Sequence, residues 1–277
     1  MTANNNPAAP NDATATAITT AQKYQTMFPD VTSLSSQKLL SDSCPHRTHT
    51  DTIRWSIDGE NALLVDVRTQ PERNVSMISG AITLEEFKRN VLPDLLDASP
   101  SQLVNRPSTL VLYCTIGYRS GMEGRKLQNE YPFLFQQQYD EEKHESFEHQ
   151  NLHGRINPQM KIRNLDGILN FANALAALDV KSNNDGGSTV AEAASEIMNT
   201  EANLPYKELL INPKTNEPTR RVHTYGLSWK NCLSTQYDPV VFSRLEFAWR
   251  GLGVVLRSIP CFFYCMGASC CKTPVQH

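Results

Sequence analysis

Hydrophobic residues gather in short runs through the middle of the chain. One run covers residues 62–65 just before Asp66, and a second covers residues 109–114. Continuous apolar runs of this length predict strands buried on both faces, as in a parallel sheet. Residues 80–83 and 161–165 predict two further short strands.

Between these runs the apolar residues follow helical spacing. Helices are predicted over 119–131 and 167–178, with another beginning near residue 84. A short helix is predicted over 34–40, with Ser35 or Ser36 as its N-cap. Strands that alternate with helices predict an α/β fold, a central parallel sheet with helices on both faces, spanning residues 55–180.

The flanks of this unit are polar. Residues 1–30 begin with a segment rich in Ala, Asn, Thr and Pro that buries little, and we predict disorder there. Residues 44–49 are predicted as a loop, and residues 135–151 as a surface loop or helix. Residues 181–200 are predicted as a linker, and residues 201–277 as a C-terminal extension with a cysteine-rich apolar tail.

Composition narrows the class of protein. Lys and Arg number 26 against 29 Asp and Glu, so the net charge of −3 does not indicate nucleic-acid binding. Mean hydropathy is −0.42, and no apolar run is long enough to span a bilayer. Seven cysteines are too few, and odd in number, for a disulfide scaffold. With no apolar or basic leader pattern at the N-terminus, the sequence predicts a cytoplasmic protein of a reducing compartment.

The most informative segment follows the clearest strand. Cys114 ends that strand, and a predicted helix begins near Arg119. Open α/β sheets place their ligands at this end of the strands, and the loop N–H groups and the helix N-terminus favour an anion there. Gly117 permits a tight turn, and the Arg119 guanidinium can hold an oxyanion through two hydrogen bonds. The pattern predicts a nucleophilic thiolate that attacks an anionic substrate.

Four segments together resemble the rhodanese family. They are residues 63–68, the degenerate Ser79-Gly80-Ala81-Ile82, the loop 114–120, and Asn164-Leu165-Asp166-Gly167 followed by Phe171. The resemblance implies a sulfurtransferase fold and activity without a cofactor or a metal. It implies that Cys114 takes a sulfane sulfur from thiosulfate or a similar donor and passes it to a thiol or to cyanide.

The same resemblance implies roles for the loop. Its backbone N–H groups would stabilise the persulfide, and Arg119 would orient the loop and attract the donor. The substrate-binding loop is then Thr115, Ile116, Gly117, Tyr118 and Arg119. Tyr118 either faces the substrate or shields the pocket. Asp66 and Arg68 offer pocket support, although an ion pair that holds neighbouring loops is the favoured interpretation.

Two other functions fit the same fold. Related phosphatase and arsenate-reductase loops carry five residues between cysteine and arginine, whereas four separate Cys114 from Arg119. The shorter loop favours a single added sulfur over a tetrahedral oxyanion. The other alternative is a non-catalytic interaction module.

The chain also departs from the pattern of the family that it resembles. Met77 stands where many members have His, Ser79 stands where they have Pro, and a single glycine follows Asp166.

Two further regions raise separate hypotheses: one lies in the polar insert of the predicted α/β unit, and the other lies beyond the unit. His144, His149 and His153 lie among glutamates, which indicates a solvated polar segment rather than a metal site. Beyond the unit, His223, Thr224, Tyr225 and Gly226 precede Trp229 and Cys232, similar to an extension of some eukaryotic rhodanese-like proteins. No catalytic role is assigned to that extension, and Cys232 is interpreted as structural rather than as a resolving thiol.

The C-terminal tail combines basic and apolar character. From Lys214 onward eight basic and three acidic residues give 8 − 3 = +5. An uncharged stretch at 259–271 is too short to span a membrane but holds four cysteines: Cys261, Cys265, Cys270 and Cys271. Two interpretations of the tail are equally supported. In one, the cysteines are reversibly S-acylated and the tail contacts a membrane surface; in the other, the tail docks on the protein.

Overall fold

The structure, a computed structural model, describes residues 12–42, 46–47, 53–97, 106–135, 160–184, 206–224 and 227–242. The chain divides into two compact units, residues 1–240 and residues 241–277. The elements below belong to the first unit.

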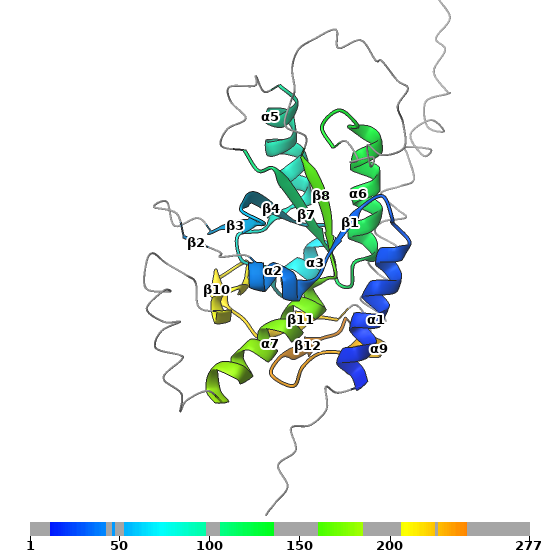
Figure 1. Ribbon diagram of the computed structural model, residues 1–277. Coiled ribbons are helices and arrows are strands. Elements are labelled where there is room, and N and C mark those ends of the chain that lie inside the picture. The colour runs from blue at the N-terminus through cyan, green and yellow to red at the C-terminus, as the bar shows by residue number, and fades with distance from the viewer. Residues whose placement is uncertain are drawn as a thin grey trace, which may run out of the picture. The chain divides into compact units, whose positions relative to one another are not determined.

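A mixed, mostly parallel sheet forms the centre of this unit (Figure 1). Its strands run in the order β1-β8-β7-β4-β3-β2, and β6 pairs with β4. They are β1 (Thr32–Leu34), β2 (His46–Arg47), β3 (Ile53–Ile57), β4 (Glu60–Asp66), β6 (Ile82–Thr83), β7 (Thr109–Tyr113) and β8 (Lys161–Leu165). The pairs β1·β8, β8·β7, β7·β4 and β4·β6 are parallel, whereas β3 is antiparallel to β4 and β2 to β3. The α/β prediction is therefore confirmed, although β2 lies inside the predicted loop 44–49 and β3 was not predicted.

Helices cover both faces of the sheet, as the sequence predicted. On one face α2 and α7 enclose a core with Trp55, Leu64 and Val111, and on the other α5 and α6 enclose Val65, Leu110 and Leu112. The helices of the central region are α2 (Ser36–Asp42), α3 (Gln70–Arg73), α4 (Leu84–Glu86), the π-helix η1 (Phe87–Val91), α5 (Leu92–Leu96), α6 (Tyr118–Glu130) and α7 (Ile168–Asn184). Phe135, placed on the surface by the sequence, is 2% exposed in the second core.

The predicted disorder of residues 1–30 is wrong for the residues that the structure describes. Helix α1 (Asp12–Thr26) packs against α6 and α7. Ala17 and Ala21 are buried, four residues apart on one helix face, and Phe28 follows with 5% exposure. A Cβ on Gly121 of α6 would lie 2.3 Å from the Phe28 ring, so this glycine makes room for the contact. Two alanines and one aromatic ring thus dock a segment whose composition is otherwise polar.

The C-terminal extension up to residue 240 is part of the same compact unit. Its elements are η4 (Tyr206–Glu208), β9 (Leu210–Asn212), β10 (Glu217–Pro218), β11 (Arg221–His223), α9 (Leu227–Lys230) and β12 (Asp238–Val240). Helix α7 continues to Asn184, so the predicted linker begins within a helix. The Asn173 side chain of α7 donates to the Cys232 carbonyl at 2.9 Å and accepts from the Ser234 N–H at 2.7 Å. No domain boundary therefore falls at residue 180.

The extension also forms a contact at Ser79, where the sequence resemblance implies proline. Strand β9 pairs with β5 (Met77–Ile78), and the Ser79 N–H donates to the Leu209 carbonyl at 2.9 Å. Proline, which the resemblance to the rhodanese family implies at this position, has no N–H to donate. Serine at position 79 thus permits one more hydrogen bond between the extension and the central unit.

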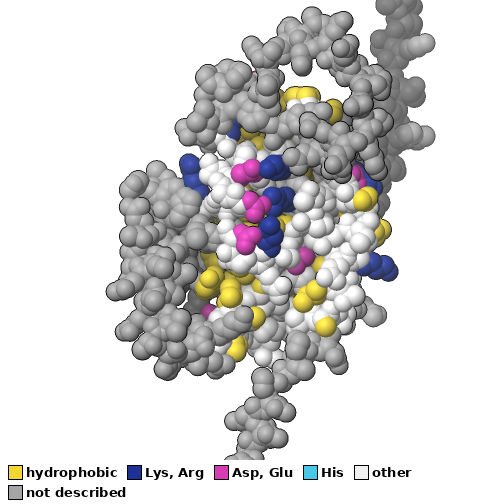
Figure 2. All heavy atoms as spheres, viewed as in Figure 1, with side chains coloured by type: hydrophobic (Ala, Val, Ile, Leu, Met, Phe, Trp, Pro, Cys, Tyr) yellow, Lys and Arg dark blue, Asp and Glu magenta, His cyan; other side chains and the backbone are white. Residues whose placement is uncertain are grey.

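Acidic and basic side chains adjoin one another on the face of the molecule in Figure 2. Surface ion pairs of this kind join Lys161 to Glu60 and Arg163 to Asp58, each at 2.7 Å. Hydrogen bonding from Arg163 is the main cause that lowers the pKa of Asp58. Because water screens exposed pairs such as these, they contribute little to stability.

Candidate functional site

Cys114 lies at the carboxyl end of β7, where the chain turns into α6. Its side chain is buried, with 1% of the residue exposed. The Gly117 N–H points at the Cys114 Sγ over 3.2 Å. Gly117 has a φ of +90°, a left-handed conformation that glycine adopts without strain, and α6 begins at the next residue. A backbone donor therefore faces the sulfur, as the predicted anion-binding loop requires.

Strand β8 and helix α7 support the loop from behind. The carbonyls of Cys114 and Thr115 accept from the N–H groups of Ile168 and Leu169, at 2.9 and 3.3 Å. The Asn164 side chain donates to the Gly117 carbonyl at 2.9 Å. These contacts fix the loop backbone, so the sulfur and its donor keep their relative position.

Gly167 permits the close approach of α7 to this loop. Its φ is +103°, and a Cβ there would lie 2.4 Å from the Thr115 carbonyl oxygen. No other residue type fits so close to backbone atoms. The single glycine after Asp166 is therefore sufficient for the turn into α7.

Arg119 forms a two-pronged ion pair with Glu72, which lies on α3. Its Nη1 and Nη2 atoms donate to Glu72 Oε2 and Oε1 at 2.8 and 2.7 Å. Nη2 also donates to Thr115 Oγ1 at 3.1 Å, and the Thr115 hydroxyl donates to Glu72 Oε1 at 3.2 Å. Burial acts to lower the pKa of Arg119, but Glu72, with a smaller effect from Cys114, raises it. Arg119 thus remains charged and joins the loop to α3.

Glu72 is held from several directions although its side chain is only 3% exposed. The N–H and hydroxyl of Thr69 donate to Glu72 Oε2 at 2.9 and 2.6 Å. Burial favours the neutral acid, but hydrogen bonds from Arg119, His223 and Thr69 outweigh it and hold the pKa of Glu72 below its usual range. The carboxylate is therefore ionised and accepts hydrogen bonds at both oxygens.

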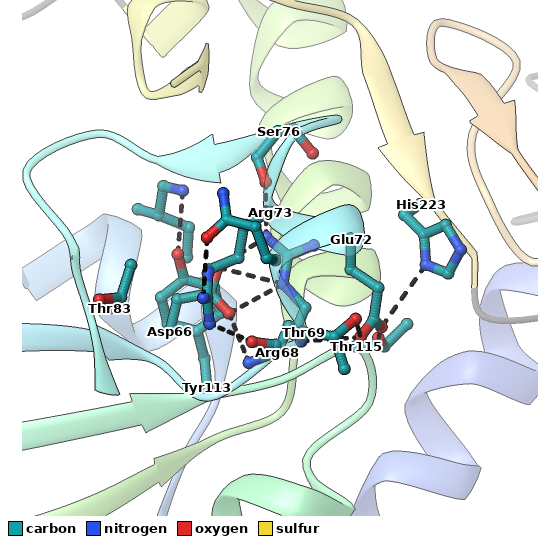
Figure 3. Close-up of polar contacts among 12 residues, drawn as sticks. Asp66, Arg68, Thr69, Glu72, Arg73, Ser76, Thr83, Tyr113, Thr115 and His223 are labelled. Atoms are coloured by element: carbon teal, nitrogen blue, oxygen red, sulfur yellow. Dashed lines mark hydrogen bonds and ion pairs between the residues drawn. The ribbon is translucent and has the colours of Figure 1, made fainter. Parts of the chain in front are cut away.

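His223 of β11 reaches the same carboxylate from the C-terminal extension. Its Nδ1 lies 3.5 Å from Glu72 Oε1, and the residue is 1% exposed. Figure 3 shows Glu72 between Thr115 on one side and His223 on the other. His223, about a hundred positions beyond the cysteine loop, thus contacts Glu72, which in turn contacts Arg119 of the loop.

Asp66 and Arg68 form a separate buried pair. Both side chains are inaccessible to solvent, and Arg68 donates through Nε and Nη2 to the two Asp66 oxygens at 2.9–3.1 and 2.7 Å. Arg68 Nη2 also donates to the Ser76 carbonyl, joining two loops. Burial opposes the charge, yet Asp66 keeps the pKa of Arg68 above its usual value. This geometry agrees with a loop-holding ion pair.

Two further loop side chains pack against other elements. The Tyr118 ring packs against Tyr24 and Phe28 at centroid distances of 5.3 and 5.7 Å, and 36% of the residue is exposed. Ile116 packs against the apolar core on the α7 side of the sheet. Tyr118 therefore joins the loop to the N-terminal helix.

The sequence did not indicate the role of Glu72. Thr69 and Glu72 have the spacing of a capping box, a pattern typical of the start of a helix. It accounts for the hydrogen bond from the Thr69 N–H to the Glu72 carboxylate, but not for the contacts of Glu72 with the loop. The partnership with Arg119, 47 positions later, arises only when α3 and the loop meet at one sheet edge. His223 was noted in a motif, but no pattern linked it to Glu72.

Several predicted features lie outside the described residues: His144, His149 and His153, and the tail cysteines Cys261, Cys265, Cys270 and Cys271. Cys232 is described, and burial raises the pKa of its thiol. Among the described residues no group of three or more potential metal ligands is found. None of the described helices is long and apolar enough to cross a bilayer.

Comparison with protein families identifies the domain. Residues 50–143 match the family model described as Rhodanese-like domain. This range includes Asp66, Glu72 and the whole cysteine loop, but ends before Asn164 and before the extension that carries His223. No curated protein and no solved structure matches the chain.

Proposed function

We propose that this protein, which contains a rhodanese-like domain, is a sulfurtransferase with Cys114 as the sulfur-carrying nucleophile. The observation that carries the proposal is the Gly117 N–H directed at the Cys114 sulfur within a six-residue loop closed by Arg119. That cradle suits one extra sulfur atom on the thiol better than a phosphate group.

The reaction has two steps. The Cys114 thiolate attacks the outer sulfur of thiosulfate, a new S–S bond forms, and sulfite leaves with the electron pair of the broken S–S bond. An acceptor thiolate or cyanide then attacks the outer sulfur of the persulfide, and Cys114 leaves as a thiolate. Neither step needs a cofactor. The Gly117 N–H stabilises the anionic sulfur in both forms.

For the reaction to occur, the donor must reach the buried Cys114 sulfur. Since Cys114 is 1% exposed, the donor reaches it only when side chains around the loop move aside. Lid and loop motions of this kind are common steps in enzyme turnover. A non-catalytic interaction module is the alternative, and it predicts that no sulfur reaches Cys114.

Mass spectrometry of the intact protein after brief exposure to thiosulfate tests the proposal. Wild type should gain the mass of one sulfur atom, Cys114→Ser should gain none, and a thiol reductant should remove the gain. Sulfur on neither protein, with thiosulfate and with an organic persulfide as donors, would favour the interaction module. Turnover of a phosphate ester that depends on Cys114 would instead indicate a phosphatase.

The cellular setting belongs to the same proposal. Cys114 is a free thiol, which suits the predicted reducing, cytoplasmic compartment. Attachment of the tail to a membrane surface stays a prediction. Deletion of residues 258–277 followed by cell fractionation tests it, and unchanged fractionation would contradict it.

A further inference from the structure

We propose that His223 is a positioning residue for the cysteine loop, acting through Glu72 on Arg119. The inference rests on the proposed function, because it concerns how the loop meets its anionic donor. It goes beyond the rhodanese-like match, which ends at residue 143.

The first step is that Glu72 fixes Arg119. The two side chains share a pair of parallel hydrogen bonds at 2.7 and 2.8 Å, and Arg119 lies in the first turn of α6. Two parallel bonds set the plane of the guanidinium as well as its distance. Any rotation of the Glu72 carboxylate therefore turns the arginine that the loop presents.

The second step is that His223 steadies one oxygen of that carboxylate. Oε2 is held by Thr69, the N-cap of the same short helix, at 2.6 and 2.9 Å. Oε1 contacts Thr115 and Arg119, which belong to the loop itself, and His223, which does not. Terminal carboxylate torsions are broad, so Oε1 needs a partner fixed outside the loop to keep its place. His223 is that partner.

The third step is that His223 is itself rigidly placed. It ends β11, which pairs in parallel with β12, and the Thr224 N–H continues the ladder to the Val240 carbonyl at 3.1 Å. The neighbouring Val222 is fully buried in the core beside α7. Because β9 also pairs with β5, the extension is anchored to the central unit at two places. His223 is thus held in place by a fixed strand, and through its contact with Glu72 it holds Arg119 of the loop in place.

The test compares the alkylation of Cys114 by anionic iodoacetate and by neutral iodoacetamide, followed at the Cys114 peptide by mass spectrometry. The ratio of the two rates reports how well the loop attracts an anion, and it needs no sulfur transfer. In His223→Leu the ratio should fall at least about threefold, a modest part of what one hydrogen bond to a charged group is worth. His223→Asn retains an N–H donor near the Nδ1 position and should restore the ratio.

Two further variants separate positioning from folding. Val222→Ala removes buried atoms from the same strand but leaves the pairing with β12 and the His223 side chain in place, so its rate ratio should fall much less than that of His223→Leu. In a Glu72→Gln background His223→Leu should change the ratio by less than about twofold, because the residue that it acts through has already changed. With thiosulfate as donor, His223→Leu should raise KM for thiosulfate more than it lowers kcat.

The results distinguish this inference from the proposed function. A protein that never takes up sulfur, but whose alkylation ratio follows His223 and Glu72 as described, would refute the sulfurtransferase and retain the positioning role. An unchanged ratio in folded His223→Leu, or an effect that adds fully to that of Glu72→Gln, would overturn the positioning role whatever the activity.

Discussion

Replacing Glu72 by glutamine is the most direct perturbation of the site, since one atom changes and the charge is lost. The glutamine side chain would keep one carbonyl oxygen and place an NH₂ group where a carboxylate oxygen now accepts hydrogen bonds. Arg119, Thr69 and Thr115 all donate to that carboxylate. At least one of these donors would then face another donor.

The expected destabilisation follows from burial. Removing one partner of a fully buried ion pair typically destabilises a protein by roughly 3–5 kcal/mol. The Glu72 side chain is 3% exposed, but that of Arg119 is 26% exposed, and water partly compensates the arginine. We therefore expect the free energy of unfolding to fall by about 3 kcal/mol, the low end of that range.

Urea unfolding at neutral pH measures this change, with Glu85→Gln as the matched control. Glu85 also pairs with an arginine, Arg73, at 3.1 Å, but the Glu85 side chain is 61% exposed. The control should lose no more than about 1 kcal/mol. Equal losses in the two variants would refute the view that burial makes the Glu72 pair important.

The pH dependence provides a second check on Glu72. Its pKa is lower in the folded protein than in the unfolded chain, where it is near the ordinary value of 4.5. The stabilisation by Glu72 is therefore complete above that value and is lost as the pH falls below it. The gap between wild type and Glu72→Gln should narrow on acidification below about pH 4.5, and a constant gap would contradict the assignment.

Three further predictions concern the surroundings of the loop. Gly167→Ala would place a Cβ 2.4 Å from the loop backbone, and it should lower the free energy of unfolding by more than about 3 kcal/mol and slow the alkylation of Cys114. In the control Gly59→Ala, a position with positive φ but no atom within 4 Å, the loss should be about 1–2 kcal/mol. Equal losses for the two variants in urea unfolding would contradict this. Burial raises the pKa of Asp166 to about 6, against hydrogen bonds from Ser36, so the native protein binds more protons than the unfolded chain between pH 3.8 and about 6. Wild-type stability should therefore fall relative to Asp166→Asn as the pH rises through that window, and parallel pH profiles in urea titrations would refute it. Ser79→Pro removes the N–H that bonds to the Leu209 carbonyl and should speed proteolysis of the extension without releasing α6, which limited trypsin digestion with mass spectrometry would reveal.

Patterns local in sequence predicted the central fold well. The apolar runs at 62–65 and 109–114 became β4 and β7, because strands buried on both faces must be apolar throughout. Strand β3 escaped prediction because its buried residues Trp55 and Ile57 alternate with polar ones and form no continuous apolar run like those of β4 and β7. Helix α1 escaped because Ala17 and Ala21, and Phe28 just beyond the helix, are buried only where this segment packs against α6 and α7.

The local sequence is enough to predict that Cys114 ends a buried strand, that Gly117 turns the chain and that Arg119 lies at the start of a helix, since each depends on neighbours within a few residues. What Arg119 binds depends instead on the folded chain. Its partner Glu72 lies 47 residues earlier, and His223 lies on a strand of the extension. Chain segments so far apart meet because the sheet and α7 bury apolar surface, and that burial has no signature in the spacing of the polar residues that it brings together.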